Sequence, residues 1–163
     1  MDEKQFQDIF CQKLKEAGWY VKTEIYDSTN NNRLDVVAYH PIFESWFCFE
    51  LKVPSAIKDY TRCLRQMIRY RNAQFKYPID LFVFITPKND FSLMFTTIER
   101  FFWRWGFGVG DCESMKIRFV NGEAIATVNL LHPQSYYFTP KEQITEIKKR
   151  ANNAWNDKDD NGT

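Results

Sequence analysis

Two apolar segments of this chain carry charged residues in their middle, and these charges restrict how the segments can be buried. Asp35 lies within Leu34–Val37, and Glu50 and Lys52 lie on either side of Leu51. An unpaired charge inside an apolar strand costs free energy, so each of these groups needs a partner. Residues two apart on a strand project from the same face, which places Glu50 and Lys52 together. If the two segments pair around the intervening turn, Asp35 also approaches Glu50.

The surrounding periodicity predicts an α/β domain, a mixed sheet with helices packed against it. Apolar stripes at helical spacing alternate with extended apolar runs, and Asn121-Gly122, a dipeptide favoured by tight hairpin turns, separates the last two runs. The predicted order is helix, three strands, helix, strand, helix, a C-terminal hairpin and a last helix. The expected helices are about Glu3–Ala17, Ser55–Lys76, Asp90–Trp105 and Pro140–Trp155, and the expected strands are Trp19–Tyr26, Leu34–His40, Trp46–Val53, Ile79–Thr86, Lys116–Val120 and Ala124–Asn129.

Length and composition favour an ordinary globular chain. The 163 residues fit one domain, which we expect to span residues 1–155, with a disordered acidic tail at 156–163. The net charge of +1 indicates no overall basic field. The chain starts with polar residues, and no apolar run approaches the roughly 18 residues of a membrane span. We therefore expect no membrane partner and a cytoplasmic, intracellular location.

The paired carboxylates indicate a site for a hard divalent cation. Asp35 and Glu50 would repel each other when buried together, and a cation between them removes that repulsion. Oxygen ligands with open water positions suit Mg²⁺ or Mn²⁺. The four cysteines form no CxxC pair, and neither histidine lies at zinc-ligand spacing from one, which argues against zinc. Such a metal can activate water and stabilise charge on a phosphate oxygen, and Lys52 could orient the water or stabilise the transition state.

The spacing of these residues resembles the core signature of the PD-(D/E)XK nuclease superfamily. Asp35 is followed by fourteen intervening residues (36–49) and then by Glu50-Leu51-Lys52, while Leu34 stands where the name-giving proline would be. The order of elements from Glu3 to Thr86 also matches that restriction endonuclease-like fold. The resemblance implies a DNA phosphodiester hydrolase in which Asp35, Glu50 and the Leu51 carbonyl bind Mg²⁺ or Mn²⁺, and Lys52 is catalytic.

A second pattern on the helix after Lys52 supports the same family. Gln66-Met67-Ile68-Arg69-Tyr70 resembles the QxxxY motif of the RecB-like branch, and residues four apart share a helix face. The resemblance implies that Gln66 positions the catalytic groups and that Tyr70 contacts the nucleic acid. RecB-like members with an iron–sulfur cluster carry clustered cysteines near the end of the domain, a feature this sequence lacks, so we expect no such cluster.

Glu3 and an arginine-rich stretch have two interpretations each. Glu3-Lys4-Gln5-Phe6 is similar to the first helix of VRR-type and resolvase-like relatives, in which a glutamate joins the metal site. Alternatively, Glu3 is an acidic first-turn residue that the helix dipole favours. Arg62, Arg65 and Arg69 either form a solvated helix face or bind DNA backbone phosphates.

Three functional interpretations stay open. The first is a metal-dependent nuclease, an endonuclease in our preferred form, acting alone, as a homodimer through the apolar stripe of Ile144–Trp155, which could equally pack on the chain's own sheet, or with a partner subunit. The second is a non-catalytic nucleic-acid-binding or interaction domain that keeps the fold, which the near-neutral charge favours. The third is a purely structural ion-pair cluster of the acids with Lys52.

Overall fold

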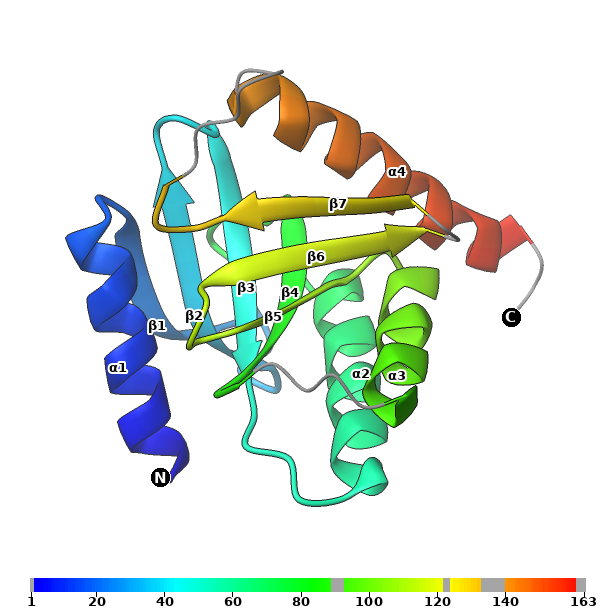
Figure 1. The fold of residues 1–163 in the computed structure, drawn as a ribbon, viewed down its shortest axis with the longest axis horizontal. Coiled ribbons are helices and arrows are strands. Elements are labelled where there is room, and N and C mark those ends of the chain that lie inside the picture. The colour runs from blue at the N-terminus through cyan, green and yellow to red at the C-terminus, as the bar shows by residue number, and fades with distance from the viewer. Residues whose placement is uncertain (1, 89–92, 122–123, 133–139, 161–163) are drawn as a thin grey trace.

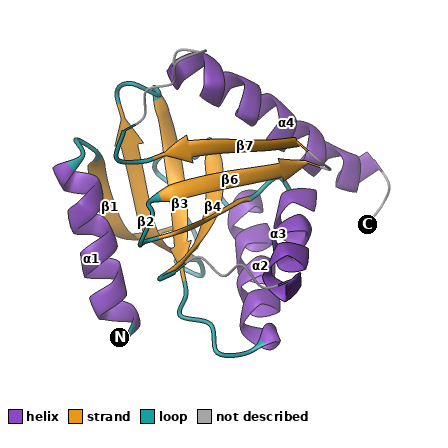
Figure 2. Ribbon diagram, viewed as in Figure 1, coloured by secondary structure: helices purple, strands orange, loops and turns teal. Residues whose placement is uncertain are grey.

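The computed structural model describes residues 2–88, 93–121, 124–132 and 140–160, and these form four α-helices and a seven-stranded mixed sheet (Figures 1 and 2). The α/β class predicted from the sequence is therefore confirmed. The helices are α1 (Glu3–Glu16), α2 (Ile57–Asn72), α3 (Leu93–Arg104) and α4 (Pro140–Asp160), and the strands are β1 (Tyr20–Tyr26), β2 (Arg33–His40), β3 (Ser45–Leu51), β4 (Leu81–Thr86), β5 (Gly108–Asp111), β6 (Lys116–Asn121) and β7 (Ala124–Asn129).

The seven strands lie in the sheet in the order in which they occur in the sequence. β3, β4 and β5 run parallel, and the pairs on either side of them are antiparallel. Figure 1 shows the sheet twisted so strongly that β6 and β7 cross in front of β3 and β4. The predicted C-terminal hairpin is present as β6 and β7, although residues 122–123 of its turn lie outside the described residues.

Alternate residues of β3 enter two apolar cores on opposite faces of the sheet. Phe47 and Phe49 pack in the core that α1 and α4 close, whereas Cys48 packs in the core beneath α2 and α3. Figure 2 shows α1 beside the first strands and α2 next to α3. Glu50 is two residues from Cys48 and therefore faces the α2 side.

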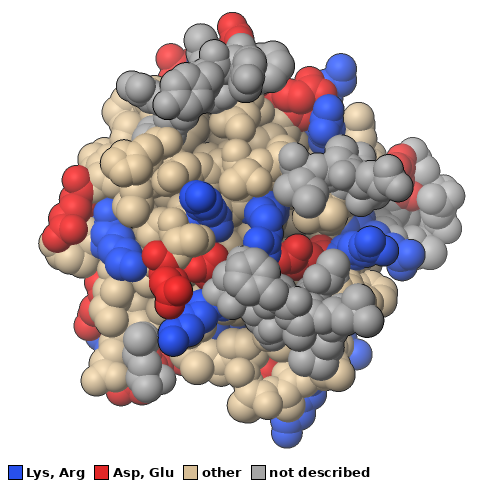
Figure 3. Space-filling model, viewed as in Figure 1, with Lys and Arg blue, Asp and Glu red and all other residues tan. Residues whose placement is uncertain are grey.

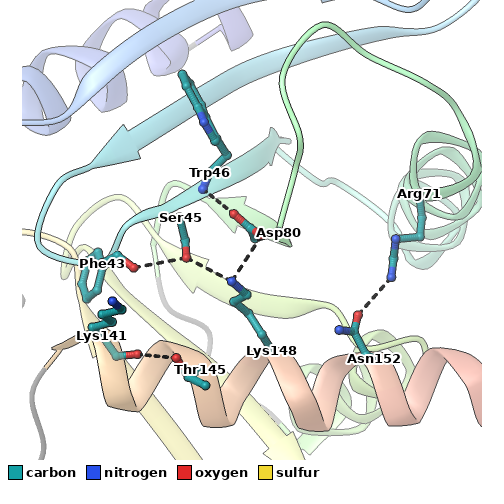
Figure 4. A network of polar contacts seen from close by, with 9 residues as sticks. All are labelled: Phe43, Ser45, Trp46, Arg71, Asp80, Lys141, Thr145, Lys148 and Asn152. Atoms are coloured by element: carbon teal, nitrogen blue, oxygen red, sulfur yellow. Dashed lines mark hydrogen bonds and ion pairs between the residues drawn. The ribbon is translucent and has the colours of Figure 1, made fainter.

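A network of polar contacts fixes α4 against the start of β3 and β4 (Figure 4). The Lys148 ammonium lies 3.3 Å from Asp80 Oδ1 and donates to Ser45 Oγ at 3.5 Å, while Asp80 Oδ2 accepts the backbone N–H of Trp46 at 2.8 Å. Further along α4, Asn152 accepts from Arg71 at the end of α2 at 3.1 Å. These contacts lie at the end of β3 remote from Glu50.

The helices differ from the sequence prediction in the bounds of α2 and α4 and in one core position of α1. α2 spans Ile57–Asn72 and not 55–76, because the backbone turns extended at Ala73 (ψ 162°), and Phe75 packs against the core from the segment after the helix. α4 continues past Trp155 to Asp160, so the predicted disordered tail begins as helix, and residues 161–163 lie outside the described part. In α1, the helical spacing of apolar residues predicts that Ile9 lies in the core with Phe6, Phe10 and Leu14, but Ile9 is 42% exposed and Cys11 is buried instead. No helix among the described residues is long and apolar enough to span a membrane.

The sequence analysis did not predict β5, which contains two glycines in four residues. Glycine has low strand propensity, so this segment carries no strand signal of its own. A Cβ at Gly108 would lie 2.7 Å from the Phe119 ring, and one at Gly110 would lie 2.6 Å from the Lys116 carbonyl oxygen. The glycines therefore allow β6 to approach β5 closely, and only the tertiary structure shows this requirement.

Substituting Gly106 with alanine is expected to lower the free energy of unfolding by about 2–4 kcal/mol, because it adds backbone strain to a steric clash. Gly106 has φ +79°, and a Cβ there would lie 2.3 Å from the Ala151 carbonyl oxygen of α4. Gly18→Ala is the matched control, with φ +91° and only His40 Nε2 nearby at 3.3 Å. The control should lose about 1–2 kcal/mol in urea unfolding; equal losses at both positions would contradict the packing argument.

Candidate active site

The register of β2 and β3 brings the two predicted carboxylates side by side. Val36 pairs with Phe49, so Asp35 and Glu50 occupy the next positions on the two antiparallel strands. Residues in such positions project from the same face of the sheet. The backbone N–H of Leu51 donates to Asp35 Oδ2 at 3.4 Å, which holds the Asp35 carboxylate at this end of β3.

Glu50 is buried, and no lysine or arginine in the described part of the chain forms an ion pair with it. Its side chain is only 6% exposed, and among the described residues its Oε2 atom has no hydrogen-bond partner. Burial raises the pKa of Glu50 well above its usual range, and the negative charge of Asp35 raises it further. Burial also raises the pKa of Asp35. The two carboxyl groups therefore favour a shared proton, or a bound cation, over two adjacent negative charges.

Lys52 lies at the end of β3, on the same face as Glu50. Its backbone N–H donates to the Ile85 carbonyl at 3.0 Å, which extends the parallel pairing of β3 and β4 by one residue. Its ammonium lies 3.0 Å from Glu3 Oε1. That hydrogen bond to Glu3 is the main reason that the pKa of Lys52 is raised, so the ammonium stays protonated at neutral pH. Lys52 therefore forms its ion pair with Glu3 and not with Glu50.

Glu3 is positioned by the start of α1. The Asp2 carboxylate caps the helix by accepting the Gln5 backbone N–H at 2.7 Å, and the Gln5 side-chain oxygen accepts the Asp2 backbone N–H at 3.1 Å. Glu3 follows in the first helical turn with its side chain 55% exposed. Its carboxylate lies at the rim of the site with Lys52, whereas Asp35 is half-buried and Glu50 is buried.

A polar pocket of about 320 Å³ opens in front of the two carboxylates. Its lining contains every predicted site residue except Arg62 and Arg65. The β1–β2 turn forms one part of the lining, the ends of β2 and β3 form another, and α2 forms a third. The lining residues are Glu3, Asn31, Asn32, Arg33, Asp35, Glu50, Leu51, Lys52, Gln66, Arg69 and Tyr70.

The QxxxY residues of α2 reach the pocket as their helical spacing predicted. Gln66 is half-buried and Tyr70 is buried, and both line the pocket beside Arg69. Burial raises the pKa of Tyr70, and the charge of Glu50 adds to this effect, so its phenol keeps its proton. Tyr70 can therefore act as a hydrogen-bond donor to an acceptor in the pocket. Arg62 and Arg65 are exposed on α2 and lie outside the lining.

The sequence analysis missed Asn31 and Asn32, which form part of the pocket lining. The Asp27 carboxylate orders their turn by accepting the backbone N–H groups of both asparagines at 3.1 Å and the Asn32 side-chain amide at 2.9 Å. These bonds, that of the Asn32 side chain foremost, lower the pKa of Asp27 to about 2. The polar run after Asp27 predicts a turn, but only the register of β1 and β2 shows that this turn borders the carboxylates.

The carboxylates of Asp35 and Glu50 can hold a divalent cation only if water molecules supply the remaining oxygen ligands. Within the described ranges, no three His, Cys, Asp or Glu side chains lie close enough together to hold an ion by themselves. Asp35 and Glu50 supply two carboxylates, one with a buried oxygen that accepts no hydrogen bond. Mg²⁺ is commonly bound by one or two carboxylates and keeps several waters, which suits this pair.

Comparisons with protein-family models, with curated proteins and with solved structures found no match. One fold can host many unrelated activities, so even a structural match would have left the activity open. The function of this chain is therefore inferred from the chemistry of the pocket.

Proposed function

We propose that this chain is a metal-dependent nuclease of the PD-(D/E)XK type that hydrolyses phosphodiester bonds within DNA. The observation that carries the proposal is the adjacent pair of half-buried Asp35 and buried Glu50, whose Oε2 atom has no hydrogen-bond partner among the described residues, in one pocket with a protonated Lys52. Structural carboxylates at this depth are normally paired with cations or hydrogen-bond donors. Glu50 Oε2 has neither among the described residues, which favours a site built for a ligand.

Asp35, Glu50 and the Leu51 carbonyl would hold Mg²⁺ or Mn²⁺ in this pocket. When bound, such a cation lowers the pKa of water and stabilises negative charge on a phosphate oxygen. The two carboxylates would lose their shared proton on binding it, because a divalent cation neutralises both charges at once. Glu3 is a further candidate ligand, and it would have to leave Lys52 to reach the pair.

Lys52 would stabilise the charge that builds up on the phosphate in the transition state. Its ammonium is protonated and partly buried, and it lies in the same pocket as the carboxylates, where electrostatic interactions are stronger than in bulk water. Gln66 can donate and accept hydrogen bonds, and the Tyr70 phenol can donate one. These two α2 residues would hold the scissile phosphate or the attacking water in position.

Arginines at the pocket would bind the DNA backbone. Arg33 and Arg69 line it from β2 and from α2, and Arg62 and Arg65 extend the basic surface along α2. On the face drawn in Figure 3, the coloured basic and acidic side chains are interspersed, so the described residues there form no extended basic field. Local phosphate contacts of this kind predict an affinity for DNA that falls with salt.

A non-catalytic domain that uses the same pocket is the second candidate. The net charge of +1 favours it, because it gives no strong overall attraction to DNA. The third interpretation, a structural ion-pair cluster, is less favoured because Lys52 pairs with Glu3 and leaves Glu50 without a cation.

Calorimetric titration with Mn²⁺ separates these candidates. Wild type should bind one ion and show a higher melting temperature in its presence, because a ligand that binds only the folded state stabilises it. Asp35→Asn should weaken binding by at least about 10- to 100-fold, since it removes one of two carboxylate ligands. Asp80→Asn is the matched control, because Asp80 belongs to the α4 network. DNA binding without Mn²⁺ binding by wild type would favour the non-catalytic domain instead.

A further inference from the structure

Four aromatic side chains form a continuous row across the first three strands and the segment before β4. Tyr20 pairs with Tyr39, and Tyr39 pairs with Trp46, so the three rings lie on one face of the sheet. The Trp46 ring centroid lies 5.9 Å from that of Tyr20, 5.2 Å from that of Tyr39 and 4.5 Å from that of Tyr77. We call Tyr20, Tyr39, Trp46 and Tyr77 the aromatic row.

The aromatic row is accessible to solvent and carries two lysines. Tyr20 is 50% exposed, and the other three rings are half-buried. The Lys22 ammonium lies 5.1 Å from the Tyr20 ring centroid, and the Lys76 ammonium lies 5.7 Å from that of Tyr77. Both lysines are exposed. The nearby Asp80, which contacts the Trp46 backbone, is paired with Lys148, and Figure 4 shows the Trp46 ring directed away from α4.

The aromatic row lies on the same face of the sheet as the candidate active site. Trp46 and Glu50 are four residues apart on β3, so they project from one face at a separation of about 14 Å. A second cavity of about 310 Å³ has lining residues from both regions, namely Tyr70, which also lines the active-site pocket, and Tyr77 of the aromatic row. The Gln74 carbonyl in this segment accepts the Ser28 backbone N–H at 3.1 Å, in the turn that presents Asn31 and Asn32.

We propose that the aromatic row, with Lys22 and Lys76, binds single-stranded DNA by stacking unpaired bases on its rings. This inference rests on the proposed nuclease function and identifies the part of the substrate held beyond the pocket. Alternation of aromatic rings with cations is the arrangement by which proteins bind single strands, because every base has a flat face and every linkage carries a charge. A duplex hides its base faces, so the substrate would carry a single-stranded segment about 14 Å from the scissile phosphate.

A second copy of the chain or another protein would use this surface differently. A protein partner would contact the rings and leave the two lysines in solvent at the edge of an apolar interface. A nucleic acid would instead contact the lysines through its phosphates. Charge complementarity therefore favours DNA as the occupant. A preference for single-stranded over duplex DNA distinguishes base stacking from the general attraction to phosphate that any basic surface shows.

The test is equilibrium binding of a fluorescent oligothymidylate of about 16 nucleotides, the upper range of single-strand site sizes, in EDTA so that no cleavage occurs. Tyr20→Ala should weaken binding by about 5- to 150-fold, because each stacked base contributes about 1–3 kcal/mol. Phe101→Ala is the matched control, since Phe101 is 49% exposed and has the Arg104 guanidinium 5.5 Å from its ring centroid. It should bind as wild type does. Tyr20→Ala and wild type should have the same affinity for a duplex of equal length.

Two further readouts distinguish base stacking from a structural role. Quenching of tryptophan fluorescence by the oligothymidylate should be reduced in Trp46→Phe. In the double variant Lys22→Gln with Lys76→Gln, the slope of log K against the logarithm of salt concentration should become less steep by about 0.7 for each lysine removed. Equal binding by wild type and Tyr20→Ala, no single-strand binding by wild type, or a dimer that Tyr20→Ala dissociates would each overturn the inference. Because these measurements contain no divalent cation, their failure is distinguishable from a failure of the nuclease proposal.

Discussion

Replacing Glu50 with glutamine is expected to reduce DNA cleavage by at least about 10³-fold while making the metal-free protein more stable. The glutamine keeps the size of the side chain and removes its negative charge. Cleavage should be lost because one of the two carboxylates that would hold the cation is gone. Stability should rise by on the order of 2 kcal/mol at pH 8, because the buried repulsion with Asp35 is also gone.

The gain in stability should depend on pH in a specific direction. The pKa of Glu50 is raised in the folded protein, so at a pH below its usual value both the folded and the unfolded chain carry the proton. As pH rises, the unfolded chain ionises first, and the folded wild type loses stability until pH passes the raised pKa. In urea unfolding, the free energies of unfolding of Glu50→Gln and wild type should therefore be similar at pH 4, whereas at pH 8 the variant should be clearly more stable.

Asp59→Asn provides the contrast for this stability effect. The Asp59 carboxylate accepts the Ser55 and Ala56 backbone N–H groups at 2.8 and 3.1 Å, and these bonds lower its pKa. Such a group contributes stability above its unfolded pKa and loses it as pH falls, so the substitution should destabilise at neutral pH. If Glu50→Gln also destabilised the metal-free protein, Glu50 would be a structural residue with a partner that we have not identified.

Replacing Lys52 with methionine is expected to slow cleavage by about 10²- to 10³-fold without preventing Mn²⁺ binding. Methionine keeps the approximate length of the side chain but carries no charge. The ammonium would act on the phosphate as it becomes more negative, so its loss should lower the turnover rate more than the affinity for DNA. Single-turnover cleavage with saturating enzyme measures this effect directly.

Lys148→Met is the matched control for Lys52→Met. Lys148 is also a partly buried lysine, and it pairs with Asp80 in the α4 network shown in Figure 4. Its replacement should lower stability and leave the cleavage rate of the folded protein unchanged. A similar loss of rate in both variants would mean that Lys52 acts through stability and not through the reaction.

The sequence predicted most of the regular elements because their apolar periodicity is strong. β2, β3 and α1 were recognisable from alternating or helically spaced apolar residues, and the charges of Asp35 and Glu50 were conspicuous against that background. β5 was not predicted, because its glycines serve the close approach of β6, a tertiary requirement without a local pattern. The burial of Cys11 in place of Ile9 likewise depends on the angle at which α1 packs.

The site was predictable where it depends on spacing along one element and unpredictable where it depends on neighbouring elements. Helical spacing placed Gln66 and Tyr70 together, and strand spacing placed Glu50 with Lys52. The role of Asn31 and Asn32 as pocket lining follows from the turn that Asp27 orders beside the carboxylates. The pairing of Lys52 with Glu3 depends on how α1 packs against the sheet, which no local pattern specifies.

The most direct test of the nuclease proposal is cleavage of end-labelled DNAs in Mg²⁺ or Mn²⁺, with EDTA as the reference. The substrates are a linear duplex, a single strand, a flapped duplex and a four-way junction, each incubated with wild type and with Glu50→Gln. We expect metal-dependent internal cuts by wild type in at least one substrate that bears single-stranded DNA, and no cuts by Glu50→Gln. Cleavage that Glu50→Gln retains, or DNA binding by wild type with every substrate left intact in both metals, would contradict the proposal.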